Sequence, residues 1–348
     1  MQRRALLAFV LLCGLVLLVA LASMGLGAVP IPVSRILRTL VSVGAPSSLE
    51  PDLLRDRLIL LEIRAPRTVL GLLVGAALAV SGTLLQSLFR NPLADPGLVG
   101  VSAGAALAAA AAIVLGDVVL GASLMASGLS FLPGAAFLGG LATTVTLYRI
   151  ATRQGRTSVA TMLLAGIALG ALSGAATGLL TYLSDDRQLR DLTFWSMGSL
   201  GGATWGKAGV VALFVTPVLG FVPFLGRSLN ALTLGEAEAY HLGIAVQPLK
   251  RIMIALVSVA VGSSVAVAGP IGFIGIVVPH LLRMTIGANH RLVLPASALL
   301  GGSLLVLADI LARTVAAPAE VPIGILTAGI GAPFFLWLLL HRRREFEA

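Results

Sequence analysis

The feature that most restricts the fold of this chain is a series of long apolar runs. The first, residues 5–27, reads ALLAFVLLCGLVLLVALASMGLG and contains no charged residue. Apolar runs of about 18 residues or more are typical of transmembrane helices. The runs are continuous in Leu, Val, Ala and Gly rather than alternating, which favours helices over a membrane barrel. Because 57% of all residues are hydrophobic and only 11% are charged, we expect an all-α polytopic membrane protein.

Ten such runs predict ten transmembrane helices in a single domain that covers residues 1–348. The expected spans are residues 5–27, 66–89, 97–116, 119–148, 159–183, 205–226, 250–267, 270–287, 292–315 and 322–340. Residues 28–63, between the first two spans, are expected to form a periplasmic linker.

The distribution of positive charge predicts the orientation of the chain. With the N-terminus in the cytoplasm, more than half of the 24 Lys and Arg residues fall in cytoplasmic loops and ends, as the positive-inside rule requires. An even number of spans then places both termini in the cytoplasm. The formal net charge of +9 is therefore interpreted as a cytoplasmic rim, and we expect no nucleic-acid partner.

The sequence offers little that favours catalysis. The four His residues are not at metal-ligand spacing, and no Ser/His/Asp or paired-carboxylate pattern is present. The stretch GGATWGKA, residues 201–208, has the glycine and lysine spacing of a phosphate-binding loop. However, Ala208 stands where Ser or Thr is needed, and no predicted strand precedes it. We therefore expect no enzyme activity, no bound metal and no permanent cofactor in this chain.

A stripe of glycines marks the fifth predicted span. Its members recur every fourth residue on one helix face and are Gly166, Gly170, Gly174 and Gly178. Such a face either allows a neighbouring helix to pack closely or provides a smooth lining for the passage of a bulky solute. Both interpretations stay open for this stripe. For Gly71 and Gly75 in the second span, packing is the favoured interpretation.

One acidic residue is expected inside a span. Asp309 lies late in the ninth span, four residues before Arg313 on the same helix face, so the two side chains can pair. A carrier driven by protons or sodium would need acidic groups near the middle of the membrane, and Asp309 is one turn from the outer end. A stand-alone secondary carrier is therefore the less favoured class.

Four long motifs occur in order from about residue 55 to the C-terminal end. They begin with RAPRTVLGLL, LGEAEAYHLGI, AVAGPIGFIG and LADILARTVA, and cover residues 64–105, 234–244, 266–283 and 307–339. In this order and spacing they resemble the FecCD-type permeases, the membrane subunits of type II ABC importers for cobalamin, ferric siderophores and haem. The resemblance implies the type II importer permease fold, a homodimer in the bacterial inner membrane, two copies of a separate ATPase that binds ATP and Mg, and a periplasmic substrate-binding protein.

The stretch RNPLADPG follows the second predicted span. Pro92 and Pro96 prevent a continuous helix, and Asn91 and Asp95 can cap the flanking helix ends. The residues alone predict a rigid cytoplasmic turn. The resemblance implies that this turn and the start of the fifth span form a cytoplasmic gate. The implied gate residues are Asn91, Leu93, Thr157 and Ser158.

The stretch LNALTLGEAEAYHLGI predicts a short amphipathic helix over residues 229–243. Leu232, Ala239 and Leu242 can share one face, which leaves the acidic residues and His241 exposed. Such a helix can lie on the membrane surface, whereas the resemblance implies that it is the coupling helix, which inserts into the ATPase. The implied coupling residues are Leu234, Gly235, Glu236, Glu238 and His241.

Two further groups of residues lie on the outer side of the predicted topology. Arg64, Arg67 and Arg313 can extend along helix ends into lipid headgroups, whereas the resemblance implies that they pair with glutamates of the binding protein. Arg187, Arg190 and Trp195 follow the glycine-striped span. The Gln-Leu-Arg and Phe-Trp elements of this stretch resemble haem permeases most closely within the family. The two arginines suit the propionates of haem, but they can also simply cap a short helix, with Trp195 as an interfacial anchor.

We therefore expect haem as the transported substrate, with a ferric siderophore or cobalamin as alternatives. The expected mechanism is alternating access, in which ATP binds the two conformations of the complex with different affinity.

Overall fold

The computed structural model describes residues 2–27, 29–41, 51–125 and 131–341. The chain is all-α apart from one hairpin, β1 (Thr152–Arg153) and β2 (Arg156–Thr157). The first half contains α1 (Gln2–Gly25), α2 (Val33–Val41), α3 (Pro51–Leu58), α4 (Ala65–Leu88), α5 (Val101–Met125), α6 (Phe131–Ala151) and α7 (Val159–Tyr182). The second half contains α8 (Asp186–Ser196), α9 (Trp205–Phe221), α10 (Gly226–Leu232), α11 (Glu236–His241), α12 (Val246–Ala268), α13 (Ile274–Ile286), α14 (His290–Ala312) and α15 (Ile323–His341).

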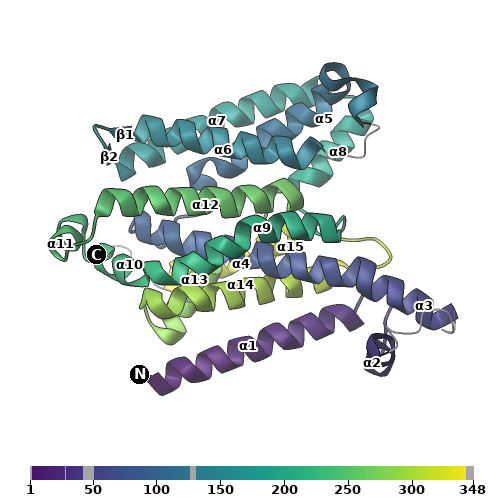
Figure 1. The fold of residues 1–348 in the computed structure, drawn as a ribbon. Helices are drawn as coiled ribbons and strands as arrows, with labels where there is room; N and C mark the ends of the chain where they lie inside the picture. The colour runs from purple at the N-terminus through teal and green to yellow at the C-terminus, as the bar shows by residue number, and fades with distance from the viewer. Residues whose placement is uncertain (1, 28, 42–50, 126–130, 342–348) are drawn as a thin grey trace.

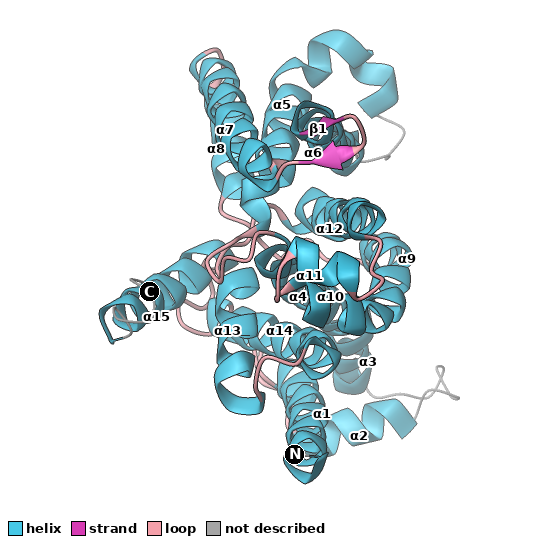
Figure 2. Cartoon of the chain, turned by 90° about the vertical axis from the view of Figure 1, so that its left-hand side faces the viewer, coloured by secondary structure: helices cyan, strands magenta, loops and turns pink. Residues whose placement is uncertain are grey.

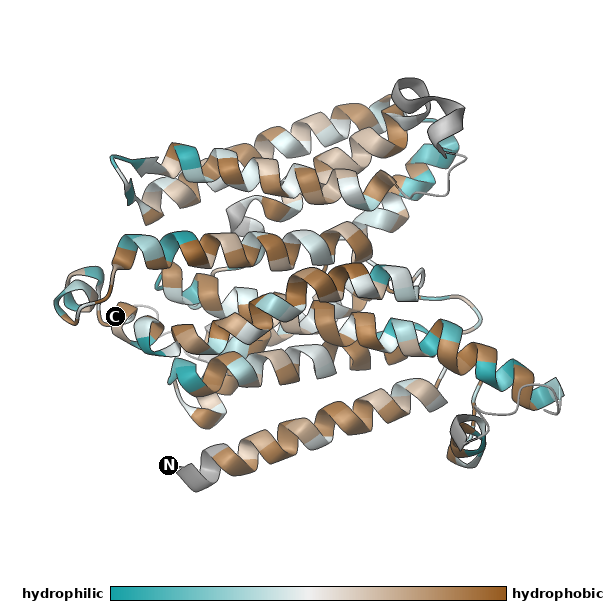
Figure 3. Cartoon of the chain, viewed as in Figure 1, coloured by the Kyte–Doolittle hydropathy of each residue, from teal (hydrophilic) through white to brown (hydrophobic). Residues whose placement is uncertain are grey.

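Each of the ten predicted spans corresponds to one apolar helix of the bundle (Figure 1). Among the described residues, seven helices are long and apolar enough to cross a membrane, and three shorter apolar helices complete the set, namely Val101–Gly116, Ile274–Ile286 and Ile323–Trp337. Hydrophobic residues cover the middle of the bundle, and hydrophilic residues gather toward its two ends (Figure 3). This arrangement confirms the predicted all-α membrane fold.

Two predicted boundaries are wrong. The break predicted at residues 117–118 does not exist, because α5 continues to Met125. Neither Gly116 nor Asp117 ends the helix. The sixth span is longer than the predicted 205–226, since the helical segment that begins at Trp205 continues to Leu232, with a 3-10 helix, Val222–Leu225, after the end of α9 at Phe221. Pro223 has no N–H for an α-helical hydrogen bond, which accounts for the change of helix type there.

The predicted linker 28–63 is largely helical. Helix α2 has one apolar face, and Ile36 on that face is buried against Ile31 and Leu60. A π-helical turn, Ile59–Arg64, joins α3 directly to α4, so one continuous helix covers Pro51–Leu88. Pro66 has no N–H to give to the carbonyl four residues earlier, which favours a widened turn at this point. The described residues of this segment therefore form helices at one end of the bundle, and residue 28 and residues 42–50 lie outside the described part.

Helix α4 is the central element, and it packs against α9, α12, α13 and α14. Two of its glycines permit this close packing. A Cβ added at Gly75 would lie 2.3 Å from the carbonyl oxygen of Gly301 in α14. At Gly82 an added Cβ would lie 1.9 Å from the carbonyl oxygen of Gly275 in α13. The packing interpretation of Gly75 is confirmed, because only glycine allows the backbones to approach so closely.

Helices α5, α6, α7 and α8 form a second group, which meets the rest of the bundle mainly along α12 (Figures 1 and 2). Within this group α7 packs against α5 and α6. Much of the remaining surface of α7 is exposed in the single chain. Its large exposed apolar side chains are those of Leu164, Ile167, Leu172 and Leu179.

Candidate functional site

The loop after α4 is a rigid polar turn, as the sequence predicts. Asn91 Oδ1 accepts a hydrogen bond of 2.9 Å from the Leu93 N–H. Asp95 is the N-cap of the 3-10 helix Pro96–Val99, and its Oδ1 accepts from the Gly97 N–H at 2.8 Å. Burial raises the pKa of the Asp95 carboxyl, and the bond from Gly97 opposes that shift. Asn91 is exposed and Leu93 is half-buried.

The 3-10 helix Pro96–Val99 contacts α7. Ser158 is the exposed N-cap of α7, and its Oγ accepts from the Thr161 N–H at 3.3 Å. Thr157 is buried and ends the β1–β2 hairpin. Gln154 and Gly155 adopt positive φ angles of 49° and 76° in the hairpin turn. Helix α7 therefore contacts the 3-10 helix of one predicted gate segment and begins directly after the other.

The predicted helix over residues 229–243 is in fact two short helices, α10 and α11. Gly235 separates them with a φ of +138°, a backbone conformation that favours glycine. Leu232 and Ala239 are buried as predicted. The prediction for Leu242 is wrong, because its side chain is 63% exposed. Glu236 is only half-exposed rather than free in solvent, since it pairs with Lys250 of α12.

Helices α10 and α11 project from the same end of the bundle as the β1–β2 hairpin (Figure 1). We call residues 226–244 the coupling segment. Its outer surface combines exposed apolar and polar side chains, namely Leu234, Glu238, Tyr240, His241 and Leu242. Exposed apolar side chains at a helix end outside the membrane are typical of a protein contact surface.

A second contact of the coupling segment leads to α14 and α4. Asn230 of α10 accepts at Oδ1 from the His290 N–H at 2.9 Å, and the same oxygen lies 3.0 Å from His290 Nδ1. The other ring nitrogen of His290 lies 2.7 Å from Ser87 Oγ, near the end of α4. The contacts of His290 with Asn230 and Ser87 were not predicted, because the three residues are far apart in the sequence.

The glycine stripe of α7 is open rather than packed. An added Cβ at Gly170, Gly174 or Gly178 would meet no atom of the described chain within 4 Å. Gly166 is buried. Packing within this chain therefore does not explain the outer three positions. A second chain, a solute or lipid remains as the neighbour that this face can accept.

Helix α8 follows α7 at the opposite end of the bundle from the hairpin. A capping box formed by Asp185 and Gln188 begins it, with bonds of 2.8 and 3.1 Å. Arg187 and Arg190 are exposed on α8, and Trp195 is half-buried against the core. Asp185 and Gln188, rather than the two arginines, therefore cap the N-terminal end of this helix.

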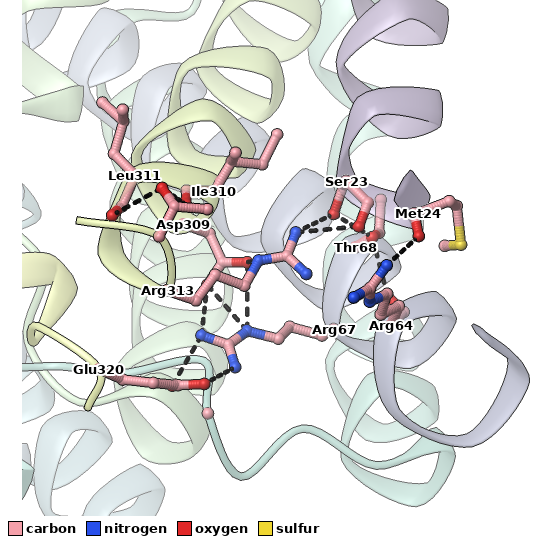
Figure 4. A network of polar contacts seen from close by, with 12 residues as sticks. Ser23, Met24, Arg64, Arg67, Thr68, Asp309, Ile310, Leu311, Arg313 and Glu320 are labelled. Atoms are coloured by element: carbon pink, nitrogen blue, oxygen red, sulfur yellow. Dashed lines mark hydrogen bonds and ion pairs between the residues drawn. The ribbon is translucent and has the colours of Figure 1, made fainter. Parts of the chain in front are cut away.

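The arginines predicted to contact a binding protein are instead buried in contacts within the chain (Figure 4). Arg67 donates to both carboxylate oxygens of Asp309, at 2.9 and 3.1 Å, and to those of Glu320, at 2.8 and 3.0 Å. Asp309 also pairs with Arg313 at 3.3 Å, as the sequence predicts. The hydrogen bond from Arg67 lowers the pKa of the half-exposed Glu320.

The remaining contacts of this network connect α4 and α14 to α1. Arg313 donates to the carbonyl oxygen and Oγ of Ser23, at 3.1 and 2.6 Å. Arg64 donates to the carbonyl oxygens of Met24 and Val29. Arg64, Arg67 and Arg313 are each at most 5% exposed. These three side chains therefore bond within the chain and connect α1, α4 and α14 at one end of the bundle, and their docking to a binding protein stays a prediction. A single sequence does not distinguish an arginine that binds a partner protein from an arginine that bonds to other residues of the same chain.

The described residues contain no group of three His, Cys, Asp or Glu side chains placed to hold a metal ion. The polar groups gather instead at the two ends of the helices.

The comparisons with known proteins agree with this geometry. A model of the FecCD transport family matches residues 15–341. The hemin transport system permease protein of Yersinia pestis is 46% identical over 346 residues, which cover 99% of this chain and 98% of that protein. The vitamin B12 import system permease protein of Escherichia coli (strain K12 / DH10B) is 46% identical over 290 residues, 83% of this chain and 86% of that protein.

A solved structure has a closely similar fold. A metal-chelate type ABC transporter in an inward-facing conformation superposes with a TM-score of 0.82 and 33% sequence identity, over 96% of this chain and 99% of that chain.

Proposed function

This chain belongs to the FecCD transport family and is a multi-pass permease subunit of an ABC importer, and we propose that it carries haem across the bacterial inner membrane. The observation that carries the substrate proposal is the extent of similarity to the hemin permease. That similarity covers 99% of this chain, whereas the cobalamin permease matches 83% at the same identity. A ferric siderophore and cobalamin are the alternatives within the same class.

The membership in this family implies partners that hydrolyse ATP and deliver substrate. We propose a homodimer with two copies of the ATPase, each holding ATP and Mg, and a periplasmic binding protein on the outer side. Both termini then lie in the cytoplasm. The exposed face of α7 supports the dimer, since Gly170, Gly174 and Gly178 offer a smooth surface that nothing in the single chain covers.

The proposed path runs along α7 from the outer to the cytoplasmic side. Arg187 and Arg190 on α8 lie at the outer end, where two cations suit the two propionates of haem, and Trp195 offers a flat apolar surface. The glycine stripe, Gly166 included, lines the middle. At the cytoplasmic end Asn91 and Leu93 form a gate with Thr157 and Ser158. Contact between α7 and the 3-10 helix Pro96–Val99 supports this gate.

The proposed contact with the ATPase is the coupling segment. Its coupling residues are Leu234, Gly235, Glu236, Glu238 and His241. The exposed apolar side chains of the segment and its position beyond the membrane helices support this role. ATP binding to the partner would move the segment and so favour one of two conformations of the gate.

Uptake into proteoliposomes tests the proposal. The chain and its ATPase are reconstituted together, with the binding protein on the outer side. Haemin, a ferric siderophore and cobalamin are offered separately with and without ATP. We expect ATP-dependent uptake of haemin alone. ATP-dependent uptake of another compound would replace the substrate, and uptake without ATP would contradict the importer mechanism and favour a secondary carrier.

A pair of variants tests the outer end of the path. The double variant Arg187→Gln, Arg190→Gln should lower haemin uptake about ten-fold or more, because each lost charge-assisted hydrogen bond is worth about 1.5–3 kcal/mol. Arg55→Gln is the matched control, since Arg55 is also exposed but lies on α3. Equal uptake in both variants would remove Arg187 and Arg190 from the path.

A further inference from the structure

Lys250 is an unusual residue for its position. It lies in the first turns of α12, at the end of the bundle that carries the coupling segment, where a lysine normally extends into water. Its side chain is instead 2% exposed. An ammonium group is almost never fully buried unless it is paired, because the loss of hydration is costly. The contacts that replace water around this group therefore indicate what it does.

Two acceptors from different parts of the chain surround the ammonium group. Glu236 Oε1 lies 2.6 Å from Lys250 Nζ, and Glu236 is the first residue of α11. The carbonyl oxygen of Thr157 accepts from the same Nζ at 2.9 Å. One buried charge thus joins the coupling segment to the residue that precedes the N-cap of α7.

A second side chain of α12 also contacts Thr157. Gln247 Oε1 accepts from the Thr157 N–H at 2.8 Å, so both backbone polar groups of Thr157 bond to side chains in the first turn and a half of α12. Thr157 is also fixed in the β1–β2 hairpin, where its Oγ1 lies 3.0 Å from that of Thr152. The start of α7 is therefore positioned by α12.

We propose that Lys250 is a positioning residue that transmits movement of the coupling segment to the gate end of α7. This inference rests on the proposed function of the coupling segment. If α11 moved away alone, the ammonium group would stay buried with one acceptor lost, and breaking a buried pair is strongly unfavourable. The segment and Thr157 must then move together, or Lys250 must become hydrated. Joint movement changes the position of the start of α7, whereas hydration of Lys250 breaks the connection between the two segments.

The competing explanation is that Lys250 only stabilises the fold. Both roles predict a less stable protein when Lys250 is changed. Only the positioning role predicts that the gate stops responding to nucleotide while the ATPase remains bound. The experiment therefore measures the response of the gate in the assembled complex.

The experiment uses a cysteine reporter at the start of α7. Cys13 is the only cysteine of the chain and is replaced by serine, and the exposed Ala160 is replaced by cysteine. The complex with the ATPase is labelled with a water-soluble maleimide, with and without ATP plus vanadate. The ratio of the two labelling rates reports how strongly nucleotide moves this end of α7. Haem delivered per ATP hydrolysed is measured in parallel.

Lys250→Met, which keeps the apolar part of the side chain but removes the ammonium group and both contacts, should reduce the nucleotide-dependent ratio about five-fold or more. Haem delivered per ATP should fall with it. Arg251→Met is the matched control, since Arg251 is the next residue, is exposed, and donates only to Gly155 at 3.2 Å. A ratio in Lys250→Met equal to that of the control would overturn the inference.

Glu236→Gln supplies an independent test that leaves the buried lysine in place. Glu236 has a side chain that is 40% exposed, so this variant should assemble even where Lys250→Met does not. It should lower the same ratio, and the double variant should be no worse than Lys250→Met alone, because the two residues act through one contact. Additive losses would show that they act separately.

The uptake and labelling measurements distinguish a failure of the proposed function from a failure of the role proposed for Lys250. If the unchanged complex shows no ATP-dependent uptake, the proposed function fails. If uptake depends on ATP and the labelling ratio survives both Lys250→Met and Glu236→Gln, the importer stands and the role of Lys250 is wrong.

Discussion

Two helices of this molecule carry glycines for opposite reasons. In α4, Gly75 and Gly82 lie against the backbone of neighbouring helices, so closely that an added Cβ would approach carbonyl oxygens to 2.3 and 1.9 Å. In α7, an added Cβ at Gly170, Gly174 or Gly178 would meet no described atom within 4 Å. The residue type is the same, but the surroundings differ completely.

The difference shows that small residues in a membrane helix allow another molecule or helix to approach closely, but they do not indicate which one. For α4 the neighbour is the chain itself, and close contact gives dispersion attraction that lipid does not replace. For α7 the neighbour lies outside the chain, and we propose that it is the second subunit and the solute. Substitutions in the two helices should therefore affect different properties of the protein.

The largest expected effect is on the packed helix. Gly82→Leu inserts a side chain where even Cβ would overlap the Gly275 carbonyl oxygen, and neither backbone can move without displacing α13. We expect a loss of more than about 4 kcal/mol in stability, which is in the range of exceptional single substitutions. Size-exclusion chromatography in detergent should show little monodisperse protein. Normal recovery would mean that α4 and α13 pack less closely than described.

The next largest effect concerns the outer end of the same packed region. Arg67→Met leaves Asp309 and Glu320 without their main partner. Breaking a buried pair costs about 3–5 kcal/mol. The melting temperature of the purified protein should fall clearly, whereas Arg187→Gln, in exposed α8, should leave it unchanged. If Arg67 contacted only an external binding protein, the two variants would melt alike.

A smaller effect on stability and a large effect on transport are expected for the open helix. Gly174→Leu adds an apolar side chain to an uncovered surface, so stability should change by less than about 1 kcal/mol. Haemin uptake should nevertheless fall about ten-fold or more, because the added side chain narrows the proposed path or disturbs the subunit contact. Gly174→Ala is the graded control. Full uptake by Gly174→Leu would place this face in lipid.

The smallest effect is the pH dependence of the Arg67 network. The hydrogen bond from Arg67 lowers the pKa of Glu320 below its usual value of 4.5. A depressed carboxyl pKa contributes stability that is present above the usual pKa and is lost as pH falls through the lowered value. Because Glu320 is half-exposed, the contribution is at most about 1 kcal/mol. Melting curves from neutral to acidic pH should show a slightly steeper decline for the unchanged protein than for Glu320→Gln. Parallel curves would contradict the assignment.

The sequence allowed the ten spans to be predicted because each one is a continuous apolar run with few charges. The Asp309–Arg313 pair and the Asp95 cap were also predictable, since both depend on residues a few positions apart. The break at Gly235 was not, because the amphipathic pattern around it continues through the glycine. The burial of Arg67 and Arg313 was not predictable either, as their partners include residues on other helices.

Lys250 illustrates why contacts between distant parts of the chain cannot be predicted from a single sequence. A lysine at a cytoplasmic helix end is what the positive-inside rule leads one to expect, so it carries no separate signal. Its partner Thr157 is 93 residues away and is contacted through a backbone carbonyl, which any residue type supplies.

The contact between α1 and α14 has a consequence for synthesis of the protein in the cell. Arg313 bonds to Ser23 across 290 residues of sequence, and Val19 packs against Val306 and Ile310. At roughly 5–20 residues per second, the first helix waits on the order of 15–60 s before its partner leaves the ribosome. Its apolar surface, with Leu11, Leu17 and Leu18 more than half exposed in the finished fold, is suited to that wait in lipid.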